Sequence, residues 1–361
     1  MKIIRWISSK LATALASLVF FSIVTISCKE SVSAPDTSPP FLTPPGARLT
    51  QGGDATQIGW YASGTKIAFE SQNLSSGIPL LGTIKSVDLL SRTIQTVDGT
   101  LREIRGFVTA GDSIFWTAPF VIYSGPQGTG YGEQVYRVSG NPVGGSARII
   151  GQGSLVAVSP DRRLVATLSE GADTLELVSL NDNIVRKFPL QETDWPLIFS
   201  PDSKQIFFRN GRLLNIANGT WTGEPIPPYS LAANSLPGTW TWTQNGFFSL
   251  SDGSEDGLDV IMLNNLNTGT STVIWRPSRD ERAGGPSFAW SADGKKFAFT
   301  SQSGPNTSPP ITNLYVCNIQ SGTSALITTV QTRLGFMSFS SSPDGNRIAY
   351  AVKGDIYFSD L

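Results

Sequence analysis

The sequence contains no histidine among its 361 residues. This excludes a Ser-His-Asp triad, a Cys-His nucleophile and any histidine-ligated metal site. Charged residues are also scarce, at 15% of the chain against an average of about 25%, and they form no basic stripe. A nucleic-acid partner is therefore not expected.

Cysteine is nearly absent, since Cys28 and Cys317 are the only two. Cys317 lies in the β-like run Asn-Leu-Tyr-Val-Cys-Asn-Ile. If Cys28 carries another group, Cys317 has no disulfide partner. We therefore expect Cys317 to be a small, buried apolar residue.

The first 27 residues have the pattern of a signal peptide. Three basic residues precede an uncharged apolar run at 11–26, which is shorter than the roughly 20 residues that a membrane span needs. The run ends in Thr-Ile-Ser-Cys, which resembles a bacterial lipobox. The resemblance implies that Cys28 becomes the lipidated N-terminus of the mature protein. The alternative is a plain secretory signal cut after Val32-Ser33-Ala34.

The remainder of the chain divides into a spacer and a domain. Residues 28–45 are rich in Pro and Ser, which favours an extended linker, and residues 46–361 form the predicted folded domain. Lys29 follows Cys28, so the Asp that retains lipoproteins in the inner membrane of enteric bacteria is missing. We expect an outer-membrane lipoprotein of the cell envelope, anchored by its N-terminal lipid and monomeric, that faces the periplasm or the exterior.

A hairpin motif recurs along the domain. Each copy is an apolar strand, a tight polar turn and a second apolar strand, and a third strand follows most copies. The seven copies span 58–71, 104–119, 155–170, 196–210, 240–252, 286–301 and 337–354. Their period of about 40 residues is that of a four-stranded propeller blade. The pattern predicts an all-β fold, a seven-bladed β-propeller.

The turn of the motif, Ser-Pro-Asp-Gly in its fullest form, has a local explanation. Pro presets φ, the Asp side chain accepts from backbone N–H groups, and Gly tolerates positive φ. We therefore interpret four acids as structural turn residues and not as catalytic groups: Asp161, Asp202, Asp293 and Asp344.

The motif and its following strands resemble the TolB-type (WD40-like) propeller repeat, most clearly at 196–210, 286–301 and 342–361. The resemblance implies a propeller from a bacterial envelope protein. Nothing in the chain matches the α/β domain that precedes the TolB propeller, so the role of TolB itself is not carried over.

The last unit, 342–361, supplies only three strands. Residues 46–53 read as a short strand at the other end of the domain. Pairing this strand with 356–358 would complete the last blade, close the ring and leave no free sheet edge.

Long connections gather on one face of the predicted ring. They are the segments 72–83, 117–133, 222–239, 278–286 and 301–312, whereas the turns between first and second strands lie on the opposite face and are tight. Long loops on a rigid scaffold often bind ligands. The candidate binding residues are Phe120, Tyr123, Tyr131, Tyr229, Arg279, Asp280, Glu281 and Arg282. The alternative is that the aromatic residues only pin their own loops.

Other notable residues receive structural interpretations. Trp60, Trp240, Trp242 and Trp290 lie on or near innermost strands, and we expect them to pack between blades. The acidic turn 251–259 lacks the spacing of a calcium loop, so a solvated turn is favoured over a Ca²⁺ site. No catalytic residue, metal site or cofactor is predicted.

Two functions fit these observations. The first is a non-catalytic, lipid-anchored binding scaffold for a protein or a cell-wall glycan on the long-loop face. The alternative is a carbohydrate-active propeller enzyme that uses carboxylates in the central funnel, which would require two carboxyl groups about 5–10 Å apart.

Overall fold

Strands rich in β-branched and aromatic residues form antiparallel sheets throughout the computed structural model. The structure describes residues 46–72, 81–125, 128–139, 147–169, 171–191, 196–208, 211–223, 240–243, 246–255, 258–265, 268, 270–278, 281–291, 293–303, 309–331, 336 and 338–361. These residues belong to one unit. Within them, no helix is long and apolar enough to cross a membrane.

The described residues build seven four-stranded sheets, which we call blades 1 to 7. From the innermost strand outwards, blade 1 is β2 (Ala55–Tyr61), β3 (Lys66–Gln72), β4 (Leu81–Asp88) and β5 (Ile94–Glu103); blade 2 is β6 (Gly106–Ala110), β7 (Ser113–Gly125), β8 (Gly128–Ser139) and β9 (Arg148–Gln152); and blade 3 is β10 (Ser154–Val158), β11 (Leu164–Leu168), β12 (Thr174–Ser179) and β13 (Val185–Pro189). A short 3-10 helix, η1 (Ala62–Gly64), joins β2 to β3.

The remaining blades follow the same order. Blade 4 is β14 (Pro196–Phe199), β15 (Gln205–Phe208), β16 (Leu213–Asn215) and β17 (Trp221–Thr222); blade 5 is β18 (Trp240–Thr243), β19 (Gly246–Glu255), β20 (Leu258–Asn265) and β21 (Thr270–Trp275); blade 6 is β22 (Glu281–Trp290), β23 (Lys296–Ser303), β24 (Ile311–Asn318) and β25 (Thr323–Gln331); and blade 7 is β26 (Ser338–Ser341), β27 (Arg347–Val352), β28 (Asp355–Asp360) and β1 (Ala47–Arg48).

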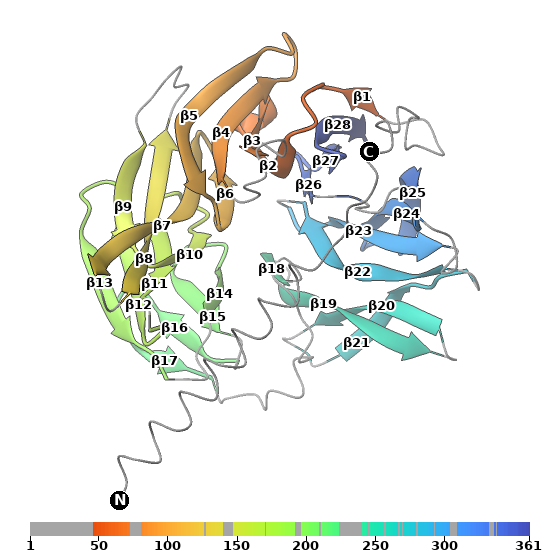
Figure 1. Cartoon of the computed structure of the whole chain (residues 1–361). Coiled ribbons are helices and arrows are strands. Elements are labelled where there is room, and N and C mark those ends of the chain that lie inside the picture. The colour runs from red at the N-terminus through yellow and green to blue at the C-terminus, as the bar shows by residue number, and fades with distance from the viewer. Residues whose placement is uncertain are drawn as a thin grey trace, which may run out of the picture. The chain divides into compact units, whose positions relative to one another are not determined.

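The blades form a ring, as the repeat predicted. Each sheet contacts the next around the ring, and blade 7 contacts blade 1 through β26 and β2. Figure 1 shows the sheets arranged about a common centre with the first strand of each repeat innermost. The prediction of an all-β propeller is confirmed, and the described residues build seven four-stranded sheets.

The hydrophobic core lies between neighbouring blades. One cluster joins Trp60 and Phe69 of blade 1 to Ala349 and Ile356 of blade 7. Another joins Phe208 of blade 4 to buried residues of blade 3. Because an isolated sheet of this size cannot bury both of its faces, each blade needs both neighbours, and the ring must close.

The N-terminal strand closes the ring as predicted. β1 pairs with β28, with Ala47 opposite Phe358 and Arg48 opposite Tyr357. The Leu49 N–H donates to the Ile356 carbonyl oxygen at 2.8 Å. β1 therefore supplies the outermost strand of blade 7.

The Ser-Pro-Asp turns share one hydrogen-bond pattern. In blade 4, the Ser200 hydroxyl donates to Asp202 Oδ1 at 2.7 Å and accepts the Gln205 N–H at 2.9 Å. Asp202 Oδ1 also accepts the Lys204 N–H at 3.1 Å. The turns that begin at Ser159, Ser291 and Ser342 repeat this pattern. The structural interpretation of the four Asp residues is confirmed.

Candidate functional site

Most residues of the predicted long-loop site lie outside the part that the structure describes. Tyr229, Arg279 and Asp280 fall outside the described residues altogether, as does the predicted lipidation site, Cys28. Tyr123, Tyr131 and Arg282 lie within strands whose side chains are not described there. The site therefore stays a prediction at these positions.

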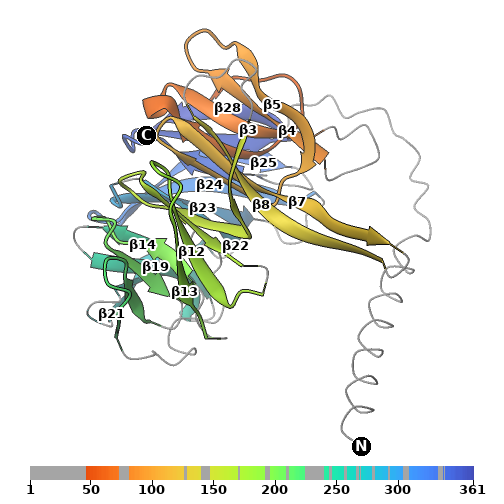
Figure 2. The same ribbon diagram turned by 90° about the vertical axis from the view of Figure 1, so that its left-hand side faces the viewer.

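The prediction of a long loop at 117–133 is wrong. β7 and β8 continue through this segment as a two-stranded ribbon, with Phe120 opposite Gly132 and Val121 opposite Tyr131. β6 and β9 pair only with 113–117 and 134–137, so they leave the outer part of the ribbon uncovered. Figure 2 shows β7 and β8 running out past the neighbouring sheets. Pro119 and the glycines of the segment suggested a loop, but strands at a sheet edge tolerate both residue types.

Glu281 serves its own blade. Its Oε1 accepts from the Ser301 hydroxyl and from Asn313 Nδ2, the latter at 2.8 Å. Burial and then the charge of Glu281 raise the pKa of the Tyr315 hydroxyl to about 12. Because these contacts hold the carboxylate against blade 6, we interpret Glu281 as a structural residue.

Asp54 makes the same arrangement in blade 1. It accepts the Ser71 hydroxyl, and Lys85 Nζ lies 3.0 Å from its Oδ2. Lys85 lies opposite Phe69 in blade 1, just as Tyr315 lies opposite Phe299 in blade 6. In both blades, a carboxylate at or just before the start of the first strand thus contacts residues of the second and third strands.

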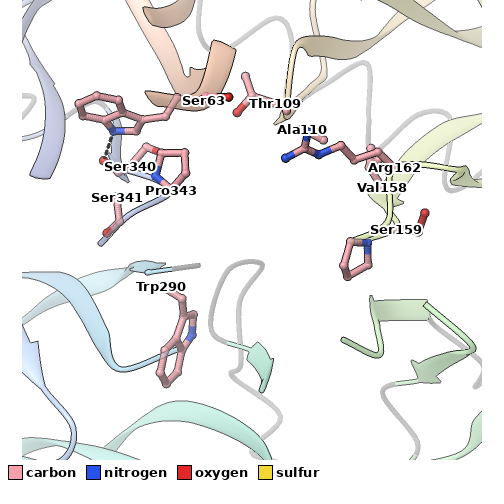
Figure 3. Close-up of a pocket in the computed structure, with 13 residues that line it drawn as sticks. Ser63, Thr109, Ala110, Val158, Ser159, Arg162, Trp290, Ser340, Ser341 and Pro343 are labelled. Carbon is pink, nitrogen blue, oxygen red and sulfur yellow. Dashed lines mark hydrogen bonds between the residues drawn. The ribbon is translucent and has the colours of Figure 1, made fainter. Parts of the chain in front are cut away.

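The described residues form a pocket of about 340 Å³ near the centre of the ring, on the face of the tight turns. We call it the central pocket. It is lined by Trp60, Ser63, Thr109, Ala110, Gly111, Val158, Ser159, Pro160, Arg162, Trp290, Ser340, Ser341 and Pro343. Figure 3 shows these side chains arriving from several blades around one open space. The sequence placed the candidate site on the other face and did not predict this pocket.

Two tryptophans have a double role here. Trp60 and Trp290 belong to the interblade core, as expected, but both also line the central pocket. Trp60 Nε1 donates to the Ser340 carbonyl oxygen at 2.8 Å, which fixes this ring against blade 7. Trp290 Nε1 is buried and has no hydrogen-bond partner among the described residues.

Arg162 is the one cation among the described residues that line the central pocket. It occupies the fourth position of the Ser-Pro-Asp turn of blade 3, where blades 6 and 7 have Gly294 and Gly345. Its φ of 61° is in the same left-handed range as those glycines, at 67° and 68°. The guanidinium lies over Gly111, where an added Cβ would come within 2.3 Å of Arg162 Nη1. A side chain at 111 would therefore displace Arg162.

Neighbouring tight turns are tied together around this face. Between blades 1 and 2, the Ala62 N–H donates to the Gly111 carbonyl oxygen at 2.8 Å. Between blades 7 and 1, Arg347 Nη2 donates to the Gly64 carbonyl oxygen at 3.2 Å, and between blades 6 and 7, Lys296 Nζ donates to the Gly345 carbonyl oxygen at 3.2 Å. Between blades 3 and 4, the Asp161 N–H donates to the Ser203 hydroxyl at 3.1 Å. These bonds link the turns of blades 6, 7, 1 and 2 in series and the turns of blades 3 and 4 as a pair.

The electrostatics of the turns are local. The Ser200 hydroxyl, followed by the Lys204 N–H, lowers the pKa of Asp202. The Ser342 hydroxyl and the Asn346 N–H do the same for the pKa of Asp344. These carboxylates remain ionised partners of their own turns at neutral pH.

Metal binding finds no support in the described residues, among which no group of three or more Cys, Asp or Glu side chains could hold an ion. In the acidic turn, the side chains of Asp252, Glu255 and Asp256 lie outside the description, and Asp259 is exposed. The interpretation of this turn as solvated stays a prediction.

Comparison with known proteins supports the fold. No protein-family model and no curated protein matches the sequence. Oligogalacturonate lyase from Vibrio parahaemolyticus matches with a TM-score of 0.54 and 12% identity, over 87% of this chain and 93% of that one. A chain of the mitotic checkpoint complex matches with a TM-score of 0.51 and 11% identity, over 93% and 99%. The chain is a β-propeller. At these identities the similarity extends to the fold and not to the ligand.

TolB from Acinetobacter baumannii is also similar, with a TM-score of 0.45 and 12% identity. The match covers 76% of this chain and 65% of TolB, so this chain spans less than two thirds of that protein.

Sequence reasoning missed Arg162 although a signal was present. The turn of blade 3 reads Ser-Pro-Asp-Arg, with Arg162 where two other turns have Gly. A residue that breaks a repeat at a position of positive φ is a candidate for a role outside the turn.

Proposed function

We propose that this protein is a non-catalytic binding propeller of the cell envelope that takes its ligand in the central pocket. The observation that carries the proposal is the pocket itself, about 340 Å³ in volume and lined by tryptophan, hydroxyl and guanidinium groups. This volume is at the lower end of the usual range of about 300–1,000 Å³ for ligand pockets. The hydrogen bonds between neighbouring turns support it, because a preorganised site loses less entropy on binding.

The placement in the envelope rests on the N-terminal sequence. The basic start, the apolar run at 11–26 and the lipobox-like end at Cys28 support export and lipid anchoring. The TolB-type turn motif is in keeping with an envelope protein. An outer-membrane position is the finer part of this proposal.

The alternative is a carbohydrate-active enzyme, and the similarity in fold to a lyase keeps it in view. Glycoside hydrolysis by the common route needs paired carboxyl groups. None of the described residues that line the central pocket is Asp or Glu, which favours binding over this chemistry.

A capture experiment separates these functions and the two faces. Full-length protein in detergent would be incubated with solubilised native envelope and with its glycan fraction. Wild type would be compared with Ser341→Phe, which fills the central pocket, and with a variant in which 119–131 is replaced by a tight turn.

We expect wild type and the shortened ribbon variant to retain the ligand and Ser341→Phe to lose it. Loss of binding by the ribbon variant alone would move the site to the long-loop face. Chemical conversion of the retained ligand would identify an enzyme instead.

A further inference from the structure

Arg162 has a side chain at a turn position where the backbone φ is positive. Positive φ is unfavourable for a residue with a Cβ, and Gly294 and Gly345 avoid that cost in the equivalent turns. Strain alone does not single out Arg162, because Ser203 has a similar φ of 59° in the next blade. Ser203 differs in having a partner, since its hydroxyl accepts the Asp161 N–H at 3.1 Å.

The guanidinium of Arg162 has no such partner. Among the described residues, it makes no hydrogen bond and no ion pair, whereas other cations of the tight turns lie near the Asp of their own turn. These pairs are Arg163–Asp161 at 4.0 Å, Lys204–Asp202 at 3.7 Å, Lys295–Asp293 at 3.5 Å and Arg347–Asp344 at 4.0 Å. Figure 3 shows the Arg162 side chain reaching from its turn past Ala110 into the open space. Its N–H donors therefore face the central pocket.

No described residue that lines the central pocket is a carboxylate that could pair with Arg162 from the protein side. A ligand that brings a carboxylate would therefore supply the acceptor that the guanidinium lacks.

The rest of the lining is small and rich in hydroxyl groups. Ser63, Thr109 and Ser341 line the central pocket beside the rings of Pro160 and Pro343. Serine and threonine hydroxyls both donate and accept, so they suit a ligand that carries hydroxyl groups of its own. The apolar part of the described lining consists of two tryptophans, two prolines, Val158 and Ala110, with no Leu, Ile, Met or Phe.

We propose that the central pocket binds an acidic sugar residue, whose carboxylate pairs with Arg162 and whose hydroxyl groups meet the serine and threonine hydroxyls of the lining. Guanidinium and carboxylate form strong, charge-assisted bonds with a planar, two-point geometry. The ligand class is thus a glycan that contains uronate residues. This proposal deepens the proposed function and rests on it, because it assigns the ligand of the same pocket.

Equilibrium titration of the full-length protein in detergent tests the assignment. The probes are uronate oligosaccharides of two to three residues, the matching neutral oligosaccharides, and an acidic tripeptide as a second source of carboxylate. We expect a uronate probe to bind at least tenfold more tightly than its neutral counterpart and than the peptide. Raising the salt concentration should weaken the binding, since an ion pair is screened.

Variants identify the groups responsible. Arg162→Gly and Arg162→Gln should each weaken uronate binding at least tenfold. Arg163→Gln is the matched control. It removes the same charge from the next residue of the turn, but that side chain pairs with Asp161, so affinity should change less than twofold.

Several results would overturn the assignment. They are equal binding of neutral and acidic saccharides, unchanged affinity in both Arg162 variants, tighter binding of the peptide, or no binding of any saccharide probe. If a ligand captured from the envelope is still lost in Ser341→Phe while no uronate binds, the proposed function stands and only the ligand class is wrong. If Ser341→Phe retains the captured ligand, the proposed function has failed as well.

Discussion

Removing the side chain of Leu49 should destabilise the junction at which the N-terminal strand closes the ring. Leu49 follows the closing strand β1, is 6% exposed, and packs in the buried cluster that joins blades 1 and 7. Truncation of a buried Leu to Ala typically costs about 2–5 kcal/mol, because transfer energy is lost and a cavity remains. Leu49→Ala should therefore reduce the free energy of unfolding by about 3 kcal/mol. That is a large share of a domain stability of roughly 5–15 kcal/mol.

Urea denaturation of the full-length protein, followed by circular dichroism, measures this loss. Leu90→Ala is the matched control, since it makes the same chemical change at a side chain that is 95% exposed, and it should alter stability by less than about 0.5 kcal/mol. Thermal melting should shift by roughly 4–5 °C for Leu49→Ala, because an unfolding entropy of about 2.1 cal/mol/K per residue over residues 46–361 corresponds to about 1.5 °C per kcal/mol.

Deletion of 46–53 should be more damaging than Leu49→Ala. It removes Leu49 together with the pairing of β1 to β28 and the bond from Leu49 N–H to Ile356. Each backbone hydrogen bond contributes about 0.5–1.5 kcal/mol. If Leu49→Ala matched Leu90→Ala, or if the deletion melted with the wild type, closure of the ring by the N-terminal strand would not contribute to stability and the reasoning would fail.

Three further predictions concern other parts of the chain. Cys28→Ala should release the protein from membranes or stall its processing; a mature-sized protein in the membrane pellet would refute lipidation. Burial raises the pKa of the Cys317 thiol to about 11, so iodoacetamide at pH 8 should label Cys317 only after unfolding, and rapid labelling of native protein would contradict its burial. The lowered pKa of Asp344 means that its contribution to stability is present above the unfolded pKa of about 3.9 and is lost as pH falls through the folded value. The stability of Asp344→Asn should therefore fall less than that of wild type between pH 5 and 2, and parallel pH curves would show that the turn carboxylate does not act this way.

The blade repeat was readable from sequence because its causes are local. Ser200, Asp202 and Gln205 make their turn within six residues, and the alternating strands on either side are equally short. Each strand–turn–strand unit can therefore be recognised in the sequence without knowing which blades lie beside it. The closing strand was also predictable, because the last unit lacked one strand and the start of the domain had one to spare.

The segment 117–133 shows that local composition can fail to distinguish a loop from a hairpin. Its proline and glycines are typical of loops, yet the two halves pair with each other over most of its length. Antiparallel pairing satisfies the backbone groups between the strands, and this does not depend on strong β-formers at every position. Composition alone did not show that the hairpin would continue beyond its blade.

The repeat and its tight turns could be read from the sequence, since both follow from patterns within a few tens of residues, and the closing strand could be inferred by comparing the two ends of the domain. The position of the pocket became clear only from the folded ring. Ser63, Arg162 and Pro343 line one cavity although they come from turns of blades 1, 3 and 7. Their meeting depends on the closed ring, which brings the same face of distant turns together around one axis. The guanidinium of Arg162 acquires its significance from that shared space.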